Sequence, residues 1–144
     1  MSQENASVVI DIGSSAIRAG LSDCKSPKVI IPSVVGSIRE HLPYRLKYIY
    51  IGDDAYSKAA ALSLKHPIER GIIENWDDIE KIYRHIFYNE LRVDPTEHSV
   101  LLSEPSIIPK IHNEKMTSLM FETFNVPSFY VTCSSLLSLY SSGR

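Results

Sequence analysis

The stretch from Asn75 to Val93, NWDDIEKIYRHIFYNELRV, decides how this chain folds. Its apolar residues recur at spacings of three and four, which predicts a helix with one buried face. These residues are Trp76, Ile79, Ile82, Tyr83, Ile86, Phe87 and Leu91. Asn75 suits the N-cap, and the acids Asp77 and Asp78 suit the positive end of the helix dipole. We therefore expect a long amphipathic helix whose apolar stripe packs into the core.

Short apolar segments on both sides of this helix predict strands. They are Ser7–Ile12, Ala16–Leu21, Lys28–Ile31, Tyr48–Gly52, Ser99–Leu102 and Ser128–Thr132. Further helices are expected at Asp54–Leu64, from about Asn113, and over Ser134–Ser142. This order predicts an α/β fold, with helices packed on a sheet. The loop-rich segment Ser33–His66 is expected to project as an insertion, with an exposed loop at Ser37–Lys47.

Length and composition are those of one globular domain, with 144 residues, of which 44% are hydrophobic and 22% are charged. The net charge of −2 gives no reason to expect nucleic acid or an acidic membrane as a partner. Cys24 and Cys133 lack the spacing of a zinc site, which predicts two reduced thiols in a cytosolic protein. The chain has no apolar run of membrane-spanning length, and Met1–Ser7 does not resemble a signal peptide.

The tip of the expected first hairpin, Asp11-Ile12-Gly13-Ser14-Ser15, is a candidate phosphate site. Glycine permits a tight turn, and consecutive backbone N–H groups at such a turn can cradle phosphate oxygens. Asp11 could hold a hydrated divalent cation, and Arg18 on the return strand could supply positive charge. Such a sequence is more often an ordinary hairpin turn, so from these residues alone both interpretations stay open.

Stretches along nearly the whole chain resemble actin, beginning with NWDDIEKIYRHIFYNELRV. The others are VVIDIGSSAIRAG (Val8–Gly20), IPSVVG (Ile31–Gly36), IGDDAYSK (Ile51–Lys58), HPIERGIIENWDD (His66–Asp78), EKMTSLMFETFNVPSFYV (Glu114–Val131) and LSLYSSGR (Leu137–Arg144). They follow one another in the order found in actins. The chain is therefore identified as a divergent member of the actin family, either an actin or an actin-related protein. The resemblance implies an actin-like ATPase fold of the ribonuclease H-like kind.

The resemblance also implies a nucleotide site at the first hairpin. Asp11 would belong to the water shell of Mg²⁺, while Gly13, Ser14 and Ser15 would contact the phosphates of ATP or ADP. Arg18 stands where the family has a lysine, which keeps the charge but gives it a wider planar head. Ser15 replaces a glycine of the family, and this would carry a steric cost if the position needs a positive φ.

The resemblance covers the small outer lobe of an actin, so we expect a truncated protein with an incomplete nucleotide site. Residues 1–32 and 68–144 would form a subdomain 1 sheet with packed helices, and residues 33–67 a subdomain 2 insertion. The LSLYSSGR match places Ser134 where actins carry the glutamine that positions the attacking water. Because a hydroxyl reaches less far than a carboxamide, we expect no catalytic residue and no ATP hydrolysis.

The histidines are not expected to take part in this chemistry. Arg70 aligns with the histidine that actins modify, which excludes that modification here. His66 is expected at the surface. Solvated positions are expected for the other four histidines, His41, His85, His98 and His112.

Two functions from different classes remain, beside a truncated product without an independent role. The first is an actin-like cytoskeletal protein of the cytoplasm, with a modified, weak site for ATP or ADP and Mg²⁺. The second is a non-enzymatic interaction module that binds actin filaments or actin-binding proteins, or joins an assembly containing actin-related proteins. The first predicts magnesium-dependent nucleotide binding through Asp11, and the second predicts partner binding without nucleotide. Neither predicts nucleic acid or a membrane as a partner.

Overall fold

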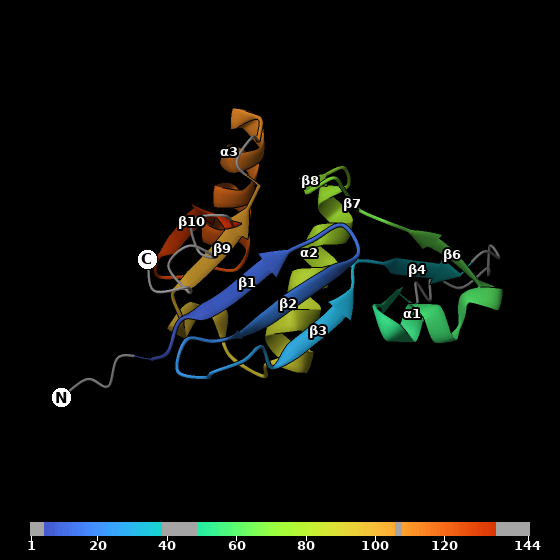
Figure 1. Ribbon diagram of the computed structural model, residues 1–144, viewed down its shortest axis with the longest axis horizontal. Helices are drawn as coiled ribbons and strands as arrows, with labels where there is room; N and C mark the ends of the chain where they lie inside the picture. The colour runs from blue at the N-terminus through green and yellow to red at the C-terminus, as the bar shows by residue number, and fades with distance from the viewer. Residues whose placement is uncertain (1–4, 39–48, 106–107, 135–144) are drawn as a thin grey trace.

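A five-stranded mixed sheet forms the centre of the computed structural model, which describes residues 5–38, 49–105 and 108–134 (Figure 1). Its strand order is β10-β9-β1-β2-β3. The strands are β1 (Val8–Ile12), β2 (Ala16–Leu21), β3 (Val29–Pro32), β9 (Val100–Glu104) and β10 (Phe129–Cys133). The first three strands pair antiparallel, whereas β9 lies parallel to both β1 and β10. The prediction of an α/β sheet is confirmed.

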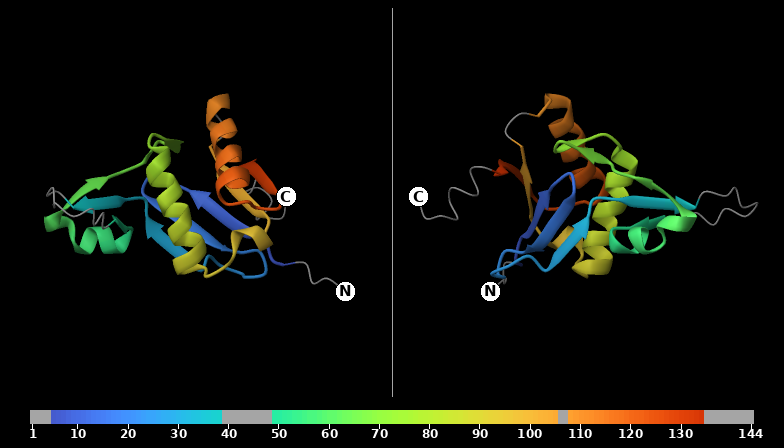
Figure 2. Two further views of the ribbon diagram at one scale, coloured as in Figure 1. Left: turned by 180° about the vertical axis from the view of Figure 1, so that it is seen from behind. Right: turned by 45° about the vertical axis from the view of Figure 1, so that its right-hand side comes forward.

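Two helical segments cover one face of this sheet (Figure 2). The first is α2 (Trp76–Arg84), which continues into the π-helical segment η2 (His85–Glu90). The second is α3 (Lys110–Ser118), which continues into η4 (Leu119–Thr123), and a short 3₁₀ segment, η3 (Pro95–Glu97), precedes β9. The Asn75 side chain accepts a hydrogen bond from the Asp78 N–H at 3.1 Å, so the predicted N-cap is confirmed.

The core lies between these helices and the sheet. Alternate residues of β1 face it, and Val8 and Ile10 are fully buried. The apolar stripe of the long helix supplies the other side, and Phe87 packs its ring 5.2 Å from that of Phe124 on the second helical segment. Burying a side chain of this size contributes about 1.5–3 kcal/mol. The stripe is therefore core packing, as its spacing predicts.

A second, three-stranded sheet extends to one side of the first (Figure 1). It consists of β4 (Val35–Ile38), β5 (Ile49–Ile51) and β6 (Leu62–Lys65) in the order β5-β4-β6, with α1 (Asp53–Ser57) and η1 (Ala59–Ala61) before β6. The prediction of one helix through Leu64 is wrong, because Leu62 and Leu64 pair with β4. Tertiary pairing here overrides the helix propensity of the alanines. The division into subdomains stays a prediction.

A small hairpin precedes the long helix. Its strands, β7 (Ile68–Glu69) and β8 (Ile72–Ile73), are joined by Arg70 and Gly71, whose φ angles are 53° and 78°. Two central residues of positive φ define the tight turn that matches the twist of a hairpin. Of the expected last helix, residues from 135 onward lie outside the described part of the chain, as do residues 39–48 of the expected loop. Within the described ranges, no helix has the length and apolarity to cross a membrane.

Candidate functional site

The β1–β2 turn carries the candidate phosphate-binding residues. The last paired residues are Ile12 and Ile17, which leaves Gly13, Ser14 and Ser15 at the tip, and the predicted hairpin is confirmed. A Cβ at Gly13 would lie 2.6 Å from the carbonyl oxygen of Ala16, so this position requires glycine. Ser15 does not adopt a positive φ, and the steric cost considered from the sequence does not arise.

Ser33, which directly follows β3, orients the backbone of this turn. Its buried hydroxyl donates to the carbonyl oxygen of Gly13 at 2.6 Å, and its N–H donates to that of Ser15 at 3.0 Å. Among the described residues, the N–H groups of Gly13, Ser14 and Ser15 find no hydrogen-bond acceptor. Consecutive unengaged N–H groups at a turn form an anion-binding concavity. Ser33 was not predicted as a site residue from the sequence. It reaches the turn because the β2–β3 pairing places its neighbour Pro32 beside Ala16.

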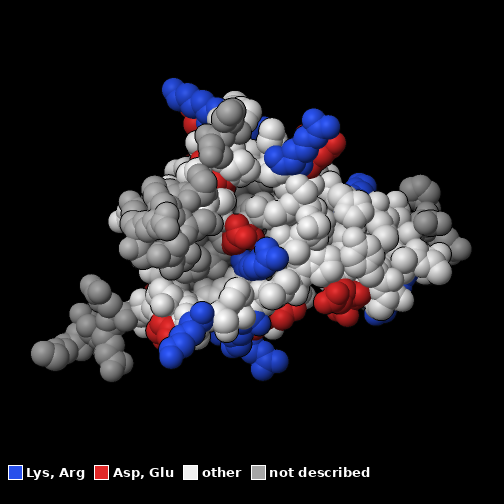
Figure 3. All heavy atoms as spheres, viewed as in Figure 1, with Lys and Arg blue, Asp and Glu red and all other residues white. Residues whose placement is uncertain are grey.

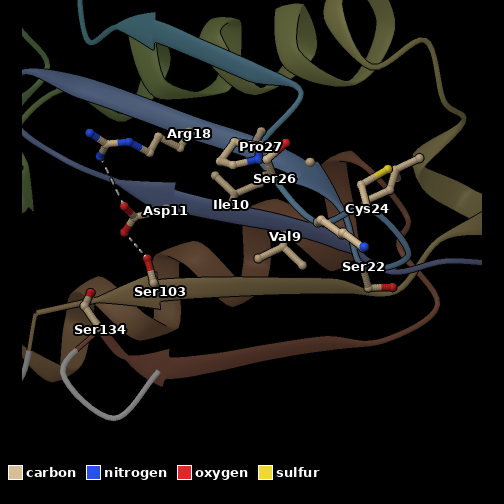
Figure 4. Close-up of a pocket in the computed structure, with 14 residues that line it drawn as sticks. Val9, Ile10, Asp11, Arg18, Ser22, Cys24, Ser26, Pro27, Ser103 and Ser134 are labelled. Carbon is tan, nitrogen blue, oxygen red and sulfur yellow. Dashed lines mark hydrogen bonds and ion pairs between the residues drawn. The ribbon is translucent and has the colours of Figure 1, made fainter. Parts of the chain in front are cut away.

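Asp11 stands at the end of β1, between charged and polar neighbours on the same face of the sheet. The strand register places it opposite Arg18 on β2 and opposite Ser103 on β9. One Asp11 carboxylate oxygen lies 3.6 Å from an Arg18 guanidinium nitrogen, and the other accepts a hydrogen bond from the Ser103 hydroxyl (Figure 4). The ion pair is about half exposed, so water screens it and its contribution to stability is small.

An open cavity of about 680 Å³ runs along the sheet face opposite the helices. Asp11, Arg18, Ser103 and Ser134 line one end of the cavity, and Cys24 lies toward the other (Figure 4). Most of the molecular surface seen from this side carries neither acidic nor basic side chains (Figure 3). The charged residues in the lining of the cavity are Asp11, Arg18 and Lys25.

Ser134 reaches this polar end, but its hydroxyl is engaged elsewhere. The Ser134 Oγ donates a hydrogen bond to the backbone carbonyl of Glu104 at 3.1 Å, which ties the end of β10 to that of β9. Burial raises the pKa of the Glu104 carboxyl, and a hydrogen bond from the Asn113 side chain opposes that shift. The Ser134 hydroxyl therefore makes a structural hydrogen bond to the backbone and does not extend freely into the cavity to position a water.

The β7–β8 hairpin contacts the β1–β2 turn directly. The Gly71 N–H donates to the Ser14 hydroxyl oxygen at 3.0 Å. A Cβ at Gly71 would lie 2.3 Å from the Pro105 ring, so the hairpin tip also packs closely against the end of β9. This contact to the turn was missed, because two-residue strands carry no periodic signal in the sequence.

His112 on α3 holds the base of the same hairpin. The prediction that His112 is solvated is wrong: it is 5% exposed, and its Nε2 accepts a hydrogen bond from the Ile73 N–H at 3.3 Å. Burial lowers the pKa of this imidazole. His85 and His98 are also partly buried and hydrogen-bonded, whereas His66 is exposed as expected. His41 lies outside the described residues.

Asp11 is suited to a hydrated cation rather than to a protein-enclosed metal centre. Across the described ranges, no three His, Cys, Asp or Glu side chains gather closely enough to hold a metal ion. Magnesium commonly keeps several waters and uses one or two carboxylates together with substrate phosphates. A single carboxylate beside a phosphate-binding turn fits that pattern.

In the comparison with protein families, the chain matches the family described as Actin over residues 2–144. The chain therefore belongs to the actin family. The sheet and its packed helices are those of an α/β, actin-like fold.

Proposed function

We propose that this chain is an actin-like cytoskeletal protein of the cytoplasm whose β1–β2 turn binds the phosphates of ATP or ADP weakly and without hydrolysis. The observation that carries the proposal is the set of three N–H groups at Gly13, Ser14 and Ser15 without an acceptor among the described residues. Ser33 holds the adjoining carbonyls, so the turn is preorganised for an anion. The ribonuclease H-like architecture of the family is part of the same proposal.

The residues at the turn fit a magnesium nucleotide. The N–H groups of Gly13 to Ser15 and the two serine hydroxyls would hold phosphate oxygens, with Arg18 adding positive charge. Asp11 would order the waters of Mg²⁺, which neutralises phosphate charge when bound. In the free protein, Asp11 and Arg18 contact each other, and a ligand must compete with that ion pair. This competition, and the exposure of Ser14 and Ser15, are why we expect the affinity to be low.

Nucleotide binding is tested by calorimetric titration of ADP with and without Mg²⁺. The variant Asp11→Asn removes the carboxylate charge while it keeps the side-chain shape. We expect this change to weaken binding about 10-fold or more with Mg²⁺, and much less without it, since charge-assisted contacts contribute about 1.5–3 kcal/mol. Asp54→Asn is the matched control, because Asp54 is an exposed acid on α1 of the second sheet.

Equal weakening in both conditions would contradict the role of Asp11 in the metal shell. If the wild-type chain binds neither form of ADP, the nucleotide proposal itself fails.

A second candidate function is a non-enzymatic interaction module. Ile30 and Tyr130 are 59% and 64% exposed, and both lie on the sheet face opposite the helices. Large exposed apolar side chains on one face are typical of protein contact surfaces. Partners for such a surface would be actin filaments, actin-binding proteins or an assembly with actin-related proteins. The ADP titration bears on both candidates. Nucleotide binding supports the first, whereas partner binding by this face without nucleotide supports the second.

A further inference from the structure

The tip of the β7–β8 hairpin is fixed beside the phosphate turn by contacts from separate parts of the chain. Gly71 donates its N–H to Ser14 and packs against Pro105. Two residues further on, the Ile73 N–H donates to His112 on α3. The hairpin and the β1–β2 turn lie side by side at the same end of the long helix (Figures 1 and 2). Whatever residue occupies the hairpin tip is therefore held close to the candidate site.

That residue is Arg70, and its backbone is in a disfavoured conformation. Its φ of 53° lies in the left-handed region, where glycine, asparagine and aspartate are favoured at the first position of such a turn. The side chain is exposed, and among the described residues it has no ion pair or hydrogen bond. The tight turn itself requires this φ, so arginine occupies a position at which the turn favours other residues.

We propose that Arg70 is a second phosphate-binding cation of this site, and that its guanidinium contacts the phosphates of a nucleoside di- or triphosphate held at the β1–β2 turn. The Cα of Arg70 is about 3.8 Å from that of Gly71, whose N–H already reaches Ser14. The Ser14 oxygen accepts this bond, which leaves its hydroxyl proton available for a phosphate oxygen. A guanidinium presents paired donors that match phosphate oxygens.

Arg70 differs from Arg18 in one respect that matters for binding. Arg18 faces the Asp11 carboxylate across the β1–β2 register, so part of its charge is compensated within the protein. Arg70 has no acidic partner among the described side chains and needs no ion pair to be broken before it meets an anion. The inference rests on the proposed nucleotide function and adds the residue that makes this site more basic than the first hairpin alone.

The test uses Arg70→Gly, with Arg92→Gly as its matched control. Arg92 is also exposed and has a φ of 54°, but it follows η2, at the far end of the long helix from the hairpin. Each variant removes one positive charge and relieves a positive φ, so neither should lower the melting temperature. Any loss of ligand affinity in Arg70→Gly then has a cause other than unfolding.

Affinities for ADP and for inorganic pyrophosphate are measured by calorimetry, with adenosine as a phosphate-free probe. We expect Arg70→Gly to weaken ADP and pyrophosphate binding about 10-fold or more, and Arg92→Gly to change it less than 2-fold. Equal affinities of wild type and Arg70→Gly, or equal losses in both variants, would overturn the role of Arg70 while leaving the nucleotide site intact. An absence of ADP binding by the wild type would overturn the nucleotide site and this inference together.

Discussion

Individual hydroxyls decide what chemistry the polar end of the cavity can support. Ser134 stands where actins carry a water-positioning glutamine, by its alignment, and its hydroxyl donates to the Glu104 carbonyl. That bond uses the hydroxyl proton and fixes the side chain against the backbone, so only the acceptor lone pairs of the hydroxyl remain for a water. A misplacement of about 1 Å in a reacting group can cost roughly 100-fold in rate. For these reasons we propose that the site binds nucleotide without hydrolysing it.

The wild-type chain is expected to release no phosphate from ATP above the background without protein. Ser134→Gln should not restore turnover, because residues that act as one catalytic unit do not rescue one another singly. Phosphate release is measured over hours at saturating Mg-ATP, with a conventional actin assayed alongside. A wild-type rate comparable to that of the conventional actin would show that Ser134 does not limit hydrolysis.

The hairpin around Gly13 to Ser15 was predicted from the sequence, and its observed register places Asp11 opposite Arg18. Ser33 could not be assigned in this way, since its two bonds to the turn depend on how β3 returns along the sheet. His112 was placed in solvent because its neighbours in sequence, Ile111 and Asn113, give no sign of the hairpin that covers it. Local pattern thus predicts strand partners, whereas contacts between distant segments require the fold.

Among the secondary-structure elements too, those with a local pattern were predicted and those that depend on distant segments were not. The long helix and the strands of the central sheet carry clear periodicity and lie close to their predicted bounds. The β7–β8 hairpin, β4 and β6 were missed, and Ser37 and Ile38 of the expected loop belong to β4. Their residues become strands through pairing with other segments. The hairpin is nevertheless central, since it joins Ser14 at the phosphate turn to His112 on α3.

Protonation of His112 is expected to loosen this hairpin. Its pKa in the folded protein is lowered from 6.5 by burial, so the unfolded chain binds the proton more readily. The stabilising contribution is therefore fully present well above pH 6.5 and is lost as the pH falls through 6.5 toward the folded pKa. One group can change the free energy of unfolding by at most about 1.4 kcal/mol per pH unit.

Urea unfolding at pH 7.5 and pH 5.5 measures this dependence. We expect the wild type to lose more stability on acidification than His112→Gln, which keeps a hydrogen-bond acceptor that does not titrate in this range. His66→Gln is the control, because His66 is exposed. If all three proteins lose the same stability between the two pH values, His112 is not the responsible group.

At the scale of the whole molecule, one face of the central sheet is covered by helices and the other carries the candidate site (Figures 2 and 4). The covered face contains the core that holds the strands in register. The other face carries Asp11 and Arg18, the ends of β9 and β10, and the exposed Ile30 and Tyr130. Membership of the actin family and this arrangement support the proposal that the turn at Gly13 to Ser15 binds nucleotide phosphates.

Amide chemical shifts of isotopically labelled protein during titration with Mg-ADP test this claim most directly. We expect saturable shifts that are largest at the N–H groups of Gly13, Ser14 and Ser15, because these donors have no acceptor among the described residues of the free protein. The amide signal of Gly52, at the start of α1 beside the second sheet, should hardly shift. Saturable shifts elsewhere with none at the turn, or no shifts at any ADP concentration, would show that the turn does not bind nucleotide phosphates.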